Sequence, residues 1–343
     1  MMSACSQLEK QPEFQRYWPA APELPRVVYE TTLRDADSLI EKDRSQILQE
    51  IATGSATGNR QTLIKPYDIA ASAGIVVVSD SMSSIVHVFD ISRKRLFAIG
   101  WRGEGRLVKP LGVAMDQQQN IYVVDAALGK IVKFDKRGHF LTTIGDAKDF
   151  SRISDVAVSR KNGKVFVVDR GGVESNNHRV VIYSAKGEKL NIIGRRGHGP
   201  GEFNHPTQIA IDNNDQVYVL DAGNFRVQIF SAKGEYHSHW GRLGNKLGNF
   251  ARPRGIAVNE NAYVFVTDAA FQNFQIFNQQ GQLLLNIGAG GGPDVPGQYM
   301  LPSGVAVDET NRIYVVDQIR RKVDVFRLLS ESEIQRLNKK ESD

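Results

Sequence analysis

Lys65-Pro66-Tyr67-Asp68-Ile69-Ala70 opens a pattern that this chain of 343 residues repeats six times. In each copy a short apolar run ending in aspartate follows the opening, and a third run such as Val132-Lys133-Phe134 comes next. A fourth run closes on glycine, as at Gly145, in every copy but the last. The other five openings are residues 109–114, 152–157, 205–210, 252–257 and 301–306.

A repeat of roughly 40 to 50 residues with four short apolar runs predicts a β-propeller. The runs are nearly continuous in apolar character, as in Ile121-Tyr122-Val123-Val124, which is typical of sheets packed on both faces. Glycine in the short turn between the third and fourth runs, as in Lys136-Arg137-Gly138-His139, favours a tight hairpin. We therefore expect an all-β fold, a six-bladed β-propeller of four-stranded antiparallel blades.

The sixth copy lacks its fourth strand, because Phe326-Arg327-Leu328-Leu329 runs directly into a polar tail at 330–343. An unpaired edge would leave the ring open, and the missing strand is available at 25–33. We expect this N-terminal strand to close a propeller that spans residues 25–329, preceded by a tether or linker at 1–24.

Residues 34–62 connect the closing strand to the first blade, and we expect a helical connection capped by Asp35 or Asp37. The apolar side chains Leu39, Ile40 and Ile47 would share one stripe of that helix. Two placements remain open, one covering the channel and one beside the rim.

Composition excludes several classes of protein. The net charge of +5 is mild, and the Lys and Arg residues are scattered through loops, so we expect no binding of nucleic acid. The sequence contains no run of 18 apolar residues, which is the length a membrane-spanning helix needs. Its single cysteine, Cys5, cannot form an internal disulfide.

An aspartate ends the second strand of every blade, and two interpretations apply to this set. Carboxylates converging on the channel could hold calcium. A residue present in every repeat more often has a structural role, here accepting backbone N–H groups and pairing with Arg179, Arg226 or Lys322. We favour the structural role for Asp80, Asp125, Asp169, Asp221, Asp268 and Asp317.

Catalytic constellations are sparse. Zinc chemistry needs several converging imidazoles, yet only His178, His198 and His205 share one face. A calcium-dependent hydrolase would need more carboxylates near the channel than Asp68 and Asp155. The entrances to the first strands offer instead Tyr67, Leu111, Ser154, Thr207, Arg254 and Ser303. We predict no catalytic residue, no metal and no cofactor, and keep a metal-dependent hydrolase or lyase in the central channel as the alternative.

A recognition surface is the remaining hypothesis. The connections after the second and fourth strands share one face and are the longer loops, and exposed aromatics and arginines commonly anchor protein contacts. We expect Phe203, Phe250 and Tyr299 to fill gaps between blades instead. The predicted partner-binding residues are Trp101, Arg102, Arg170, Arg195, Arg196, His198, Arg254, Arg320 and Arg321.

The Asn177-His178-Arg179 stretch and the connection at 194–203 resemble NHL repeats, and residues 18–329 are similar to bacterial six-bladed NHL-type propeller proteins, many of them lipoproteins. The resemblance implies this fold and a binding role, and we expect a monomeric, non-catalytic scaffold that binds a protein partner. Some relatives lie beside multihaem cytochromes, which suggests redox partners.

Met2-Ser3-Ala4-Cys5-Ser6 is similar to a lipoprotein cleavage box with lipidation at Cys5, although Met2 replaces the usual leucine and no signal region precedes it. We expect a lipid-anchored protein of the cell envelope, facing the periplasm or the cell surface. The alternative is a cytoplasmic protein with an incidental cysteine.

Overall fold

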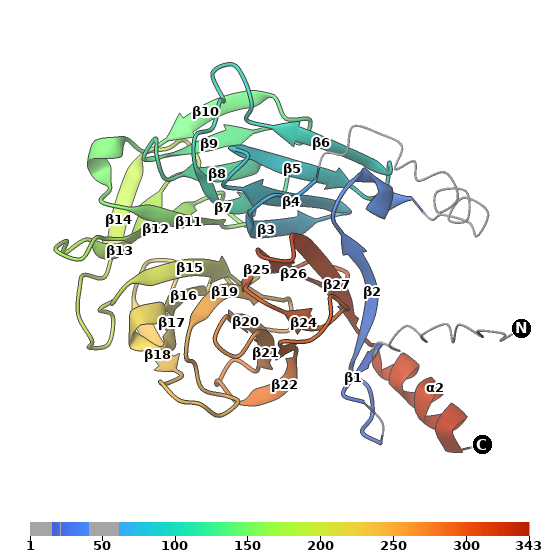
Figure 1. The fold of residues 1–343 in the computed structure, drawn as a ribbon. Coiled ribbons are helices and arrows are strands. Elements are labelled where there is room, and N and C mark those ends of the chain that lie inside the picture. The colour runs from blue at the N-terminus through green and yellow to red at the C-terminus, as the bar shows by residue number, and fades with distance from the viewer. Residues whose placement is uncertain (1–15, 21, 41–61, 343) are drawn as a thin grey trace, which may run out of the picture.

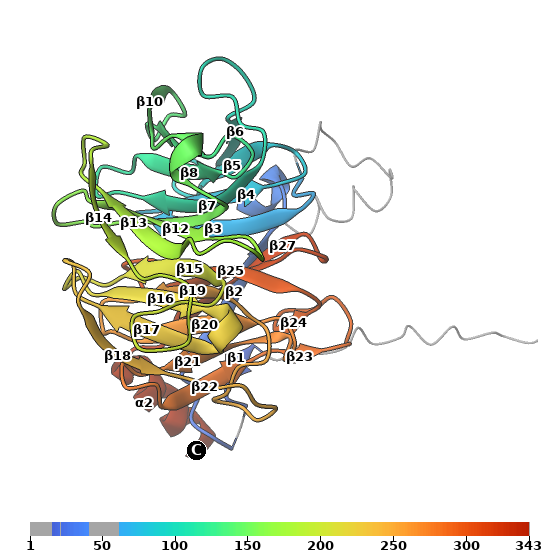
Figure 2. The same ribbon diagram turned by 90° about the vertical axis from the view of Figure 1, so that its left-hand side faces the viewer.

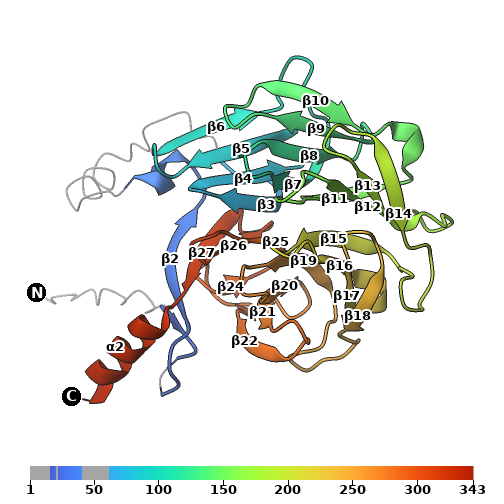
Figure 3. The same ribbon diagram turned by 180° about the vertical axis from the view of Figure 1, so that it is seen from behind.

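A computed structural model of the chain describes residues 16–20, 22–40 and 62–342. Its strands form six antiparallel sheets that follow one another around a central axis, in the order of the chain (Figure 1). The prediction of an all-β, six-bladed propeller is confirmed. Figure 2, turned by 90°, and Figure 3, seen from behind, show the same order of sheets around the ring.

Each of blades 1 to 5 consists of an inner strand beside the axis and three strands leading outward, and blade 6 has four strands outside its inner strand. Blades 1 to 3 contain β3 (Pro66–Ser72), β4 (Ile75–Asp80), β5 (Ile85–Asp90) and β6 (Arg95–Ile99); β7 (Pro110–Met115), β8 (Ile121–Asp125), β9 (Lys130–Phe134) and β10 (Phe140–Ile144); and β11 (Ile153–Val158), β12 (Val165–Arg170), β13 (His178–Tyr183) and β14 (Lys189–Ile193). Blades 4 to 6 contain β15 (Pro206–Ile211), β16 (Val217–Asp221), β17 (Arg226–Phe230) and β18 (Tyr236–Trp240); β19 (Pro253–Val258), β20 (Val264–Asp268), β21 (Asn273–Phe277) and β22 (Leu283–Ile287); and β25 (Pro302–Val307), β26 (Arg312–Asp317), β27 (Lys322–Leu328), β2 (Val27–Leu33) and β1 (Tyr17–Trp18).

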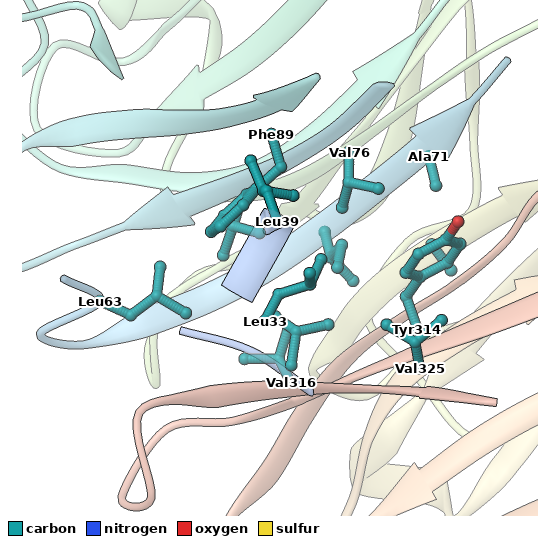
Figure 4. Close-up of a cluster of buried hydrophobic side chains, with 13 residues drawn as sticks. Leu33, Leu39, Leu63, Ala71, Val76, Phe89, Tyr314, Val316 and Val325 are labelled. Carbon is teal, nitrogen blue, oxygen red and sulfur yellow. The ribbon is translucent and has the colours of Figure 1, made fainter. Parts of the chain in front are cut away.

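The hydrophobic core is divided among the six contacts between neighbouring blades, with one buried cluster at each. Figure 4 shows the cluster between blades 6 and 1, where Tyr314 and Val325 face Val76 and Phe89. The large side chains Phe203, Phe250 and Tyr299 are fully buried, which agrees with the expectation that they fill gaps between blades. Because burial of one large apolar side chain contributes about 1.5–3 kcal/mol, each blade depends on its neighbours for stability.

The N-terminal strand closes the ring. Strand β2 pairs antiparallel with β27 from Val27 opposite Leu328 to Leu33 opposite Val323, and the two strands lie side by side in Figure 1. Strand β1 adds a fifth strand to blade 6, within residues 1–24, where a tether or linker was expected. There the Trp18 ring packs edge-on against Phe326, at 5.2 Å between ring centroids.

Short 3-10 helices and one α-helix complete the described structure. The expected cap at Asp35 begins only η1 (Ala36–Leu39), and residues 41–61, with the rest of the expected helix, lie outside the described residues, as does Cys5. The predicted polar tail forms α2 (Glu331–Ser342), which lies outside the ring next to β1 (Figures 1 and 3). The minor elements are η2 (Ala147–Asp149), η3 (Ala222–Asn224), β23 (Ala289–Gly290) and β24 (Gln298–Tyr299). None of the helices in the described ranges is long and apolar enough to cross a membrane.

Candidate functional site at the channel mouth

The aspartate that ends the second strand of each blade holds two loops in place. In blade 2, Asp125 accepts hydrogen bonds from the backbone N–H groups of Val108, at 2.6 Å, and Leu128, at 3.0 Å. The first of these precedes the inner strand, and the second begins the turn into the third strand. The other five, Asp80, Asp169, Asp221, Asp268 and Asp317, likewise accept N–H groups from the segment before their inner strand.

Two of the predicted cation partners contact these aspartates. Arg226 Nε lies 2.8 Å from Asp221 Oδ2, and Arg179 Nε lies 3.4 Å from Asp169 Oδ2. Lys322 lies opposite Asp317 in the β26–β27 register, but its ammonium pairs instead with Asp324, at 2.8 Å. These carboxylates are therefore occupied by the protein's own donors.

The inner strands begin at one end of the channel, which we call the channel mouth. Each inner strand breaks register just after its opening residue, and in three blades a backbone N–H beside this break is satisfied by a side chain of the adjacent blade. Three side chains supply acceptors across blade boundaries. Asp68 accepts a hydrogen bond from the backbone N–H of Val113 at 2.9 Å, and Asp155 accepts one from Ile209 at 2.8 Å. The side-chain oxygen of Gln208 accepts one from Ile256 at 3.0 Å.

Glycines in the same ring leave room for these acceptors. A Cβ at Gly112 would lie 2.2 Å from Asp155 Oδ1, and a Cβ at Gly304 would lie 2.6 Å from Asp68 Oδ1. Because contacts that short cannot form, larger residues at these two positions would displace the buried carboxyl groups.

Asp68 and Asp155 form a buried carboxyl pair beneath the mouth. Their side chains are 4% and 3% exposed, and Gln208 Nε2 donates to Asp68 Oδ1 at 2.7 Å. Burial raises the pKa of Asp68 to about 6, and burial together with the Asp68 charge raises the pKa of Asp155 well above its usual range. The pair therefore retains a proton near neutral pH, since two adjacent buried carboxylates repel each other.

Basic side chains surround the mouth. The residue just before the opening proline or isoleucine of the inner strand is basic in five blades, and Arg170 and Arg254 add two half-buried guanidiniums. The basic set at the mouth comprises Lys65, Lys109, Arg152, His205 and Arg252 at the rim, with Arg170 and Arg254. Within the described ranges, none of the Lys and Arg side chains of this set forms a salt bridge or a hydrogen bond.

Tyr67 lies with the two half-buried arginines, although the three residues come from blades 1, 3 and 5. Burial raises the pKa of Tyr67, an effect that the charges of Arg254 and Arg170 oppose. Burial also lowers the pKa of both arginines. The mouth is thus a concentrated positive site in a partly desolvated position.

The histidines near this site already have partners. His178 Nδ1 accepts the backbone N–H of His205 at 3.1 Å, which places the proton of neutral His178 on Nε2, 3.3 Å from Gly172 O. His198 Nδ1 contacts Asn224 Oδ1 at 2.7 Å. Burial and the nearby Arg170 lower the pKa of His205. No group of three or more His, Cys, Asp or Glu side chains with metal-binding geometry occurs among the described residues.

The predicted partner-binding residues do not gather in one place. Trp101 is 56% exposed, with the Arg102 guanidinium 4.1 Å from its ring centroid. Arg195 pairs with Glu202 at 2.9 Å, and Arg196 donates to Val173 O at 2.8 Å. Only Arg170 and Arg254 reach the mouth.

Arg320 was a wrong choice as an exposed contact. Its side chain is 8% exposed and donates to Gly292 O at 2.7 Å, so the loop before β24 and β25 covers it. Its neighbour Arg321 is exposed.

The rim residues Lys65, Lys109, Arg152 and Arg252 were not selected from the sequence. The signal was present in the aligned openings, where the position before the proline or isoleucine is basic in five of six copies. Two of these openings also contain an aspartate, Asp68 or Asp155, but among the described residues neither aspartate forms an ion pair with the basic residue three positions before it.

A model of the family described as 6-bladed beta-propeller matches residues 145–240 and 256–339. The Drosophila melanogaster protein brain tumor is 31% identical over 122 residues, which are 34% of this chain and 11% of that protein. The Rattus norvegicus peptidylglycine alpha-amidating monooxygenase is 29% identical over 133 residues, 35% of this chain and 13% of that protein. The chain thus matches only a small part of these relatives.

Among solved structures, a gluconolactonase from Xanthomonas campestris superposes with a TM-score of 0.57 at 17% identity, covering 78% of this chain and 87% of that one. At that identity the likeness concerns the fold alone.

Proposed function

This chain belongs to the six-bladed β-propeller family, and we propose that it is a non-catalytic binding protein that holds an acidic partner protein against its channel mouth. The observation that carries the proposal is the set of basic side chains at the mouth that have no carboxylate partner among the described residues. Elsewhere in the propeller, buried arginines such as Arg226 are paired with acids.

Electrostatics explains why this arrangement suits recognition. A cluster of like charges destabilises a fold slightly, and it raises the rate at which an oppositely charged partner arrives. Longer loops of the same face carry Trp101, Arg195 and Arg196, which would extend the contact outward from the mouth.

The test is affinity capture from the native cell with tagged protein at increasing salt. Charge reversal at the rim, Lys109→Glu with Arg152→Glu and Arg252→Glu, is expected to abolish capture of the wild-type partners. The matched control is Lys136→Glu with Arg137→Glu and Lys186→Glu, in hairpins on the opposite face. Equal loss in both variants, or retention of the partners by the rim variant, would reject the proposal.

We propose in addition that the contact occurs at the cell envelope. Support comes from the resemblance of residues 2–6 to a lipoprotein cleavage box, with Cys5 as the lipidated residue. Mass spectrometry of the purified N-terminus would show a diacylglyceryl group on Cys5. An unmodified Cys5 in protein from the native cell would rule out the anchor.

A further inference from the structure

Three buried polar atoms at the channel mouth have no hydrogen-bond partner among the described residues. They are Arg170 Nε, Thr207 Oγ1 and Ser303 Oγ. Thr207 and Ser303 occupy the same position in their repeats, one residue after the opening proline, so they lie at one level of the ring. Each unsatisfied buried donor costs about 1–3 kcal/mol, which folded proteins rarely tolerate in numbers.

Positive charge accompanies these donors. Arg170 and Arg254 are half-buried, and no carboxylate of the described residues pairs with either. The nearest acids, Asp68 and Asp155, face each other and the backbone below the mouth. Because that pair keeps one proton, it carries at most a single negative charge, which compensates the two guanidiniums above it only in part.

Tyr67 brings a third hydroxyl to the same level as Thr207 and Ser303, again one residue after the opening proline. Its neighbours across the mouth are the two arginines, which come from blades 3 and 5. Rotation about χ1 between staggered wells turns a Ser or Thr hydroxyl without moving the backbone. The mouth can therefore surround a small polar group with donors from several blades.

We infer that the channel mouth binds one oxyanion, a carboxylate or a phosphate, between Arg170 and Arg254, with the hydroxyls of Tyr67, Thr207 and Ser303 as hydrogen-bond donors. The planar guanidinium donates two parallel hydrogen bonds and fits both anions. The inference rests on the proposed function in that the anion would be an acidic side chain or chain end of the partner.

Titration calorimetry with three probes tests the inference and identifies the source of the anion. The probes are inorganic phosphate, acetyl-Ala-Ala with a free carboxylate, and the same dipeptide with a C-terminal amide. We expect saturable binding with one site for at least one anion and none for the amide. Preference for the dipeptide indicates a carboxylate ligand, and preference for phosphate indicates a phosphorylated one.

Single variants locate the site. Arg170→Gln and Arg254→Gln should each weaken binding by about tenfold or more, because each removes a charged donor. Thr207→Val and Ser303→Ala change the fold least and should weaken binding by about threefold to tenfold. Arg242→Gln is the matched control, since this arginine is exposed in a loop of the same face and its Nε donates to Asn249 Oδ1.

Two results would overturn the inference. One is the absence of saturable anion binding by folded wild-type protein. The other is equal affinity in Arg254→Gln and Arg242→Gln. If anions bind while rim charge reversal leaves partner capture intact, only the proposed function fails. If capture is lost by rim reversal while no anion binds, only this inference fails.

Discussion

The blade-end aspartates and the channel mouth use the same residue types in opposite ways. At Asp221 the carboxylate is inaccessible to solvent and accepts from Asn204 N–H, Arg226 Nε and Asn224 Nδ2 at 2.7 to 2.8 Å. At the mouth, Arg170 and Arg254 have no such partners among the described residues. Buried charges that have partners support one folded structure. Buried charges without partners destabilise it locally, and a bound ligand of opposite charge could offset that cost.

Removing the carboxylate of Asp221 should give the largest effect, because it leaves Arg226 buried and unpaired. We expect Asp221→Ala to lower the free energy of unfolding by about 3–5 kcal/mol, measured by urea denaturation. Asp146→Ala, at an exposed loop where the carboxylate caps η2, serves as the control and should lower the free energy of unfolding much less than Asp221→Ala does. A loss below about 1 kcal/mol at Asp221 would show that the blade-end cluster contributes little.

Asp155→Asn should change the free energy of unfolding by an intermediate amount and in the opposite direction, so that the variant is more stable than wild type. The folded pKa values of Asp68 and Asp155 are raised, so the folded state binds a proton more tightly than the unfolded state. Wild-type stability should therefore fall as pH rises from about 4 through 6 and beyond. An asparagine keeps the acceptor for Ile209 N–H and can donate to Asp68. The variant should therefore be more stable than wild type at pH 8, by about 2 kcal/mol.

Chemical denaturation at pH 5 and pH 8 checks this expectation. The difference between wild type and Asp155→Asn should grow toward the higher pH. A difference that is constant, or larger at pH 5, would mean that the two carboxyl groups are not coupled as the structure indicates. Asp215→Asn is a suitable comparison, because Asp215 lies in a turn and accepts from Ser159 Oγ and Asn162 Nδ2.

The smallest effect on stability is expected from Arg254→Gln. Since Arg254 has no ion pair to lose, the free energy of unfolding should change by less than about 1 kcal/mol, while oxyanion binding is lost. The stability of wild type and variant, compared by thermal unfolding at equal salt, separates a binding role from a structural one. Destabilisation as large as that of Asp221→Ala would place Arg254 with the structural arginines.

Sequence reasoning was most effective where a property repeats. The six openings, the aspartates and the glycine-closed runs repeat in phase, and the structure has six blades in that phase. The missing fourth strand of the last copy pointed correctly to residues 25–33, which contain β2. The prediction of a helix after β2 is met only by η1 in the described residues, and α2 was not anticipated.

The sequence alone could not show which arginines are covered by other loops and which stand at the mouth without an acidic partner. Arg320 and Arg254 were not distinguished by the sequence, yet Arg320 is covered by the loop that contains Gly292 and Asp294, and Arg254 stands at the mouth without an acid among the described residues. Similarly, Asp68 and Asp155 belong to different repeats, and the sequence predicted only that both lie near the channel, too few to form a calcium site. Only the closed ring brings them into one buried pair.

The sequence by itself therefore determined the number of blades, the strand order and the closure, because these follow from periodic burial of apolar runs. Tertiary structure decided which charges are satisfied and which face the channel. That outcome depends on distances of a few ångströms between side chains of different blades. Closure of the ring sets those distances, and no local sequence pattern encodes them.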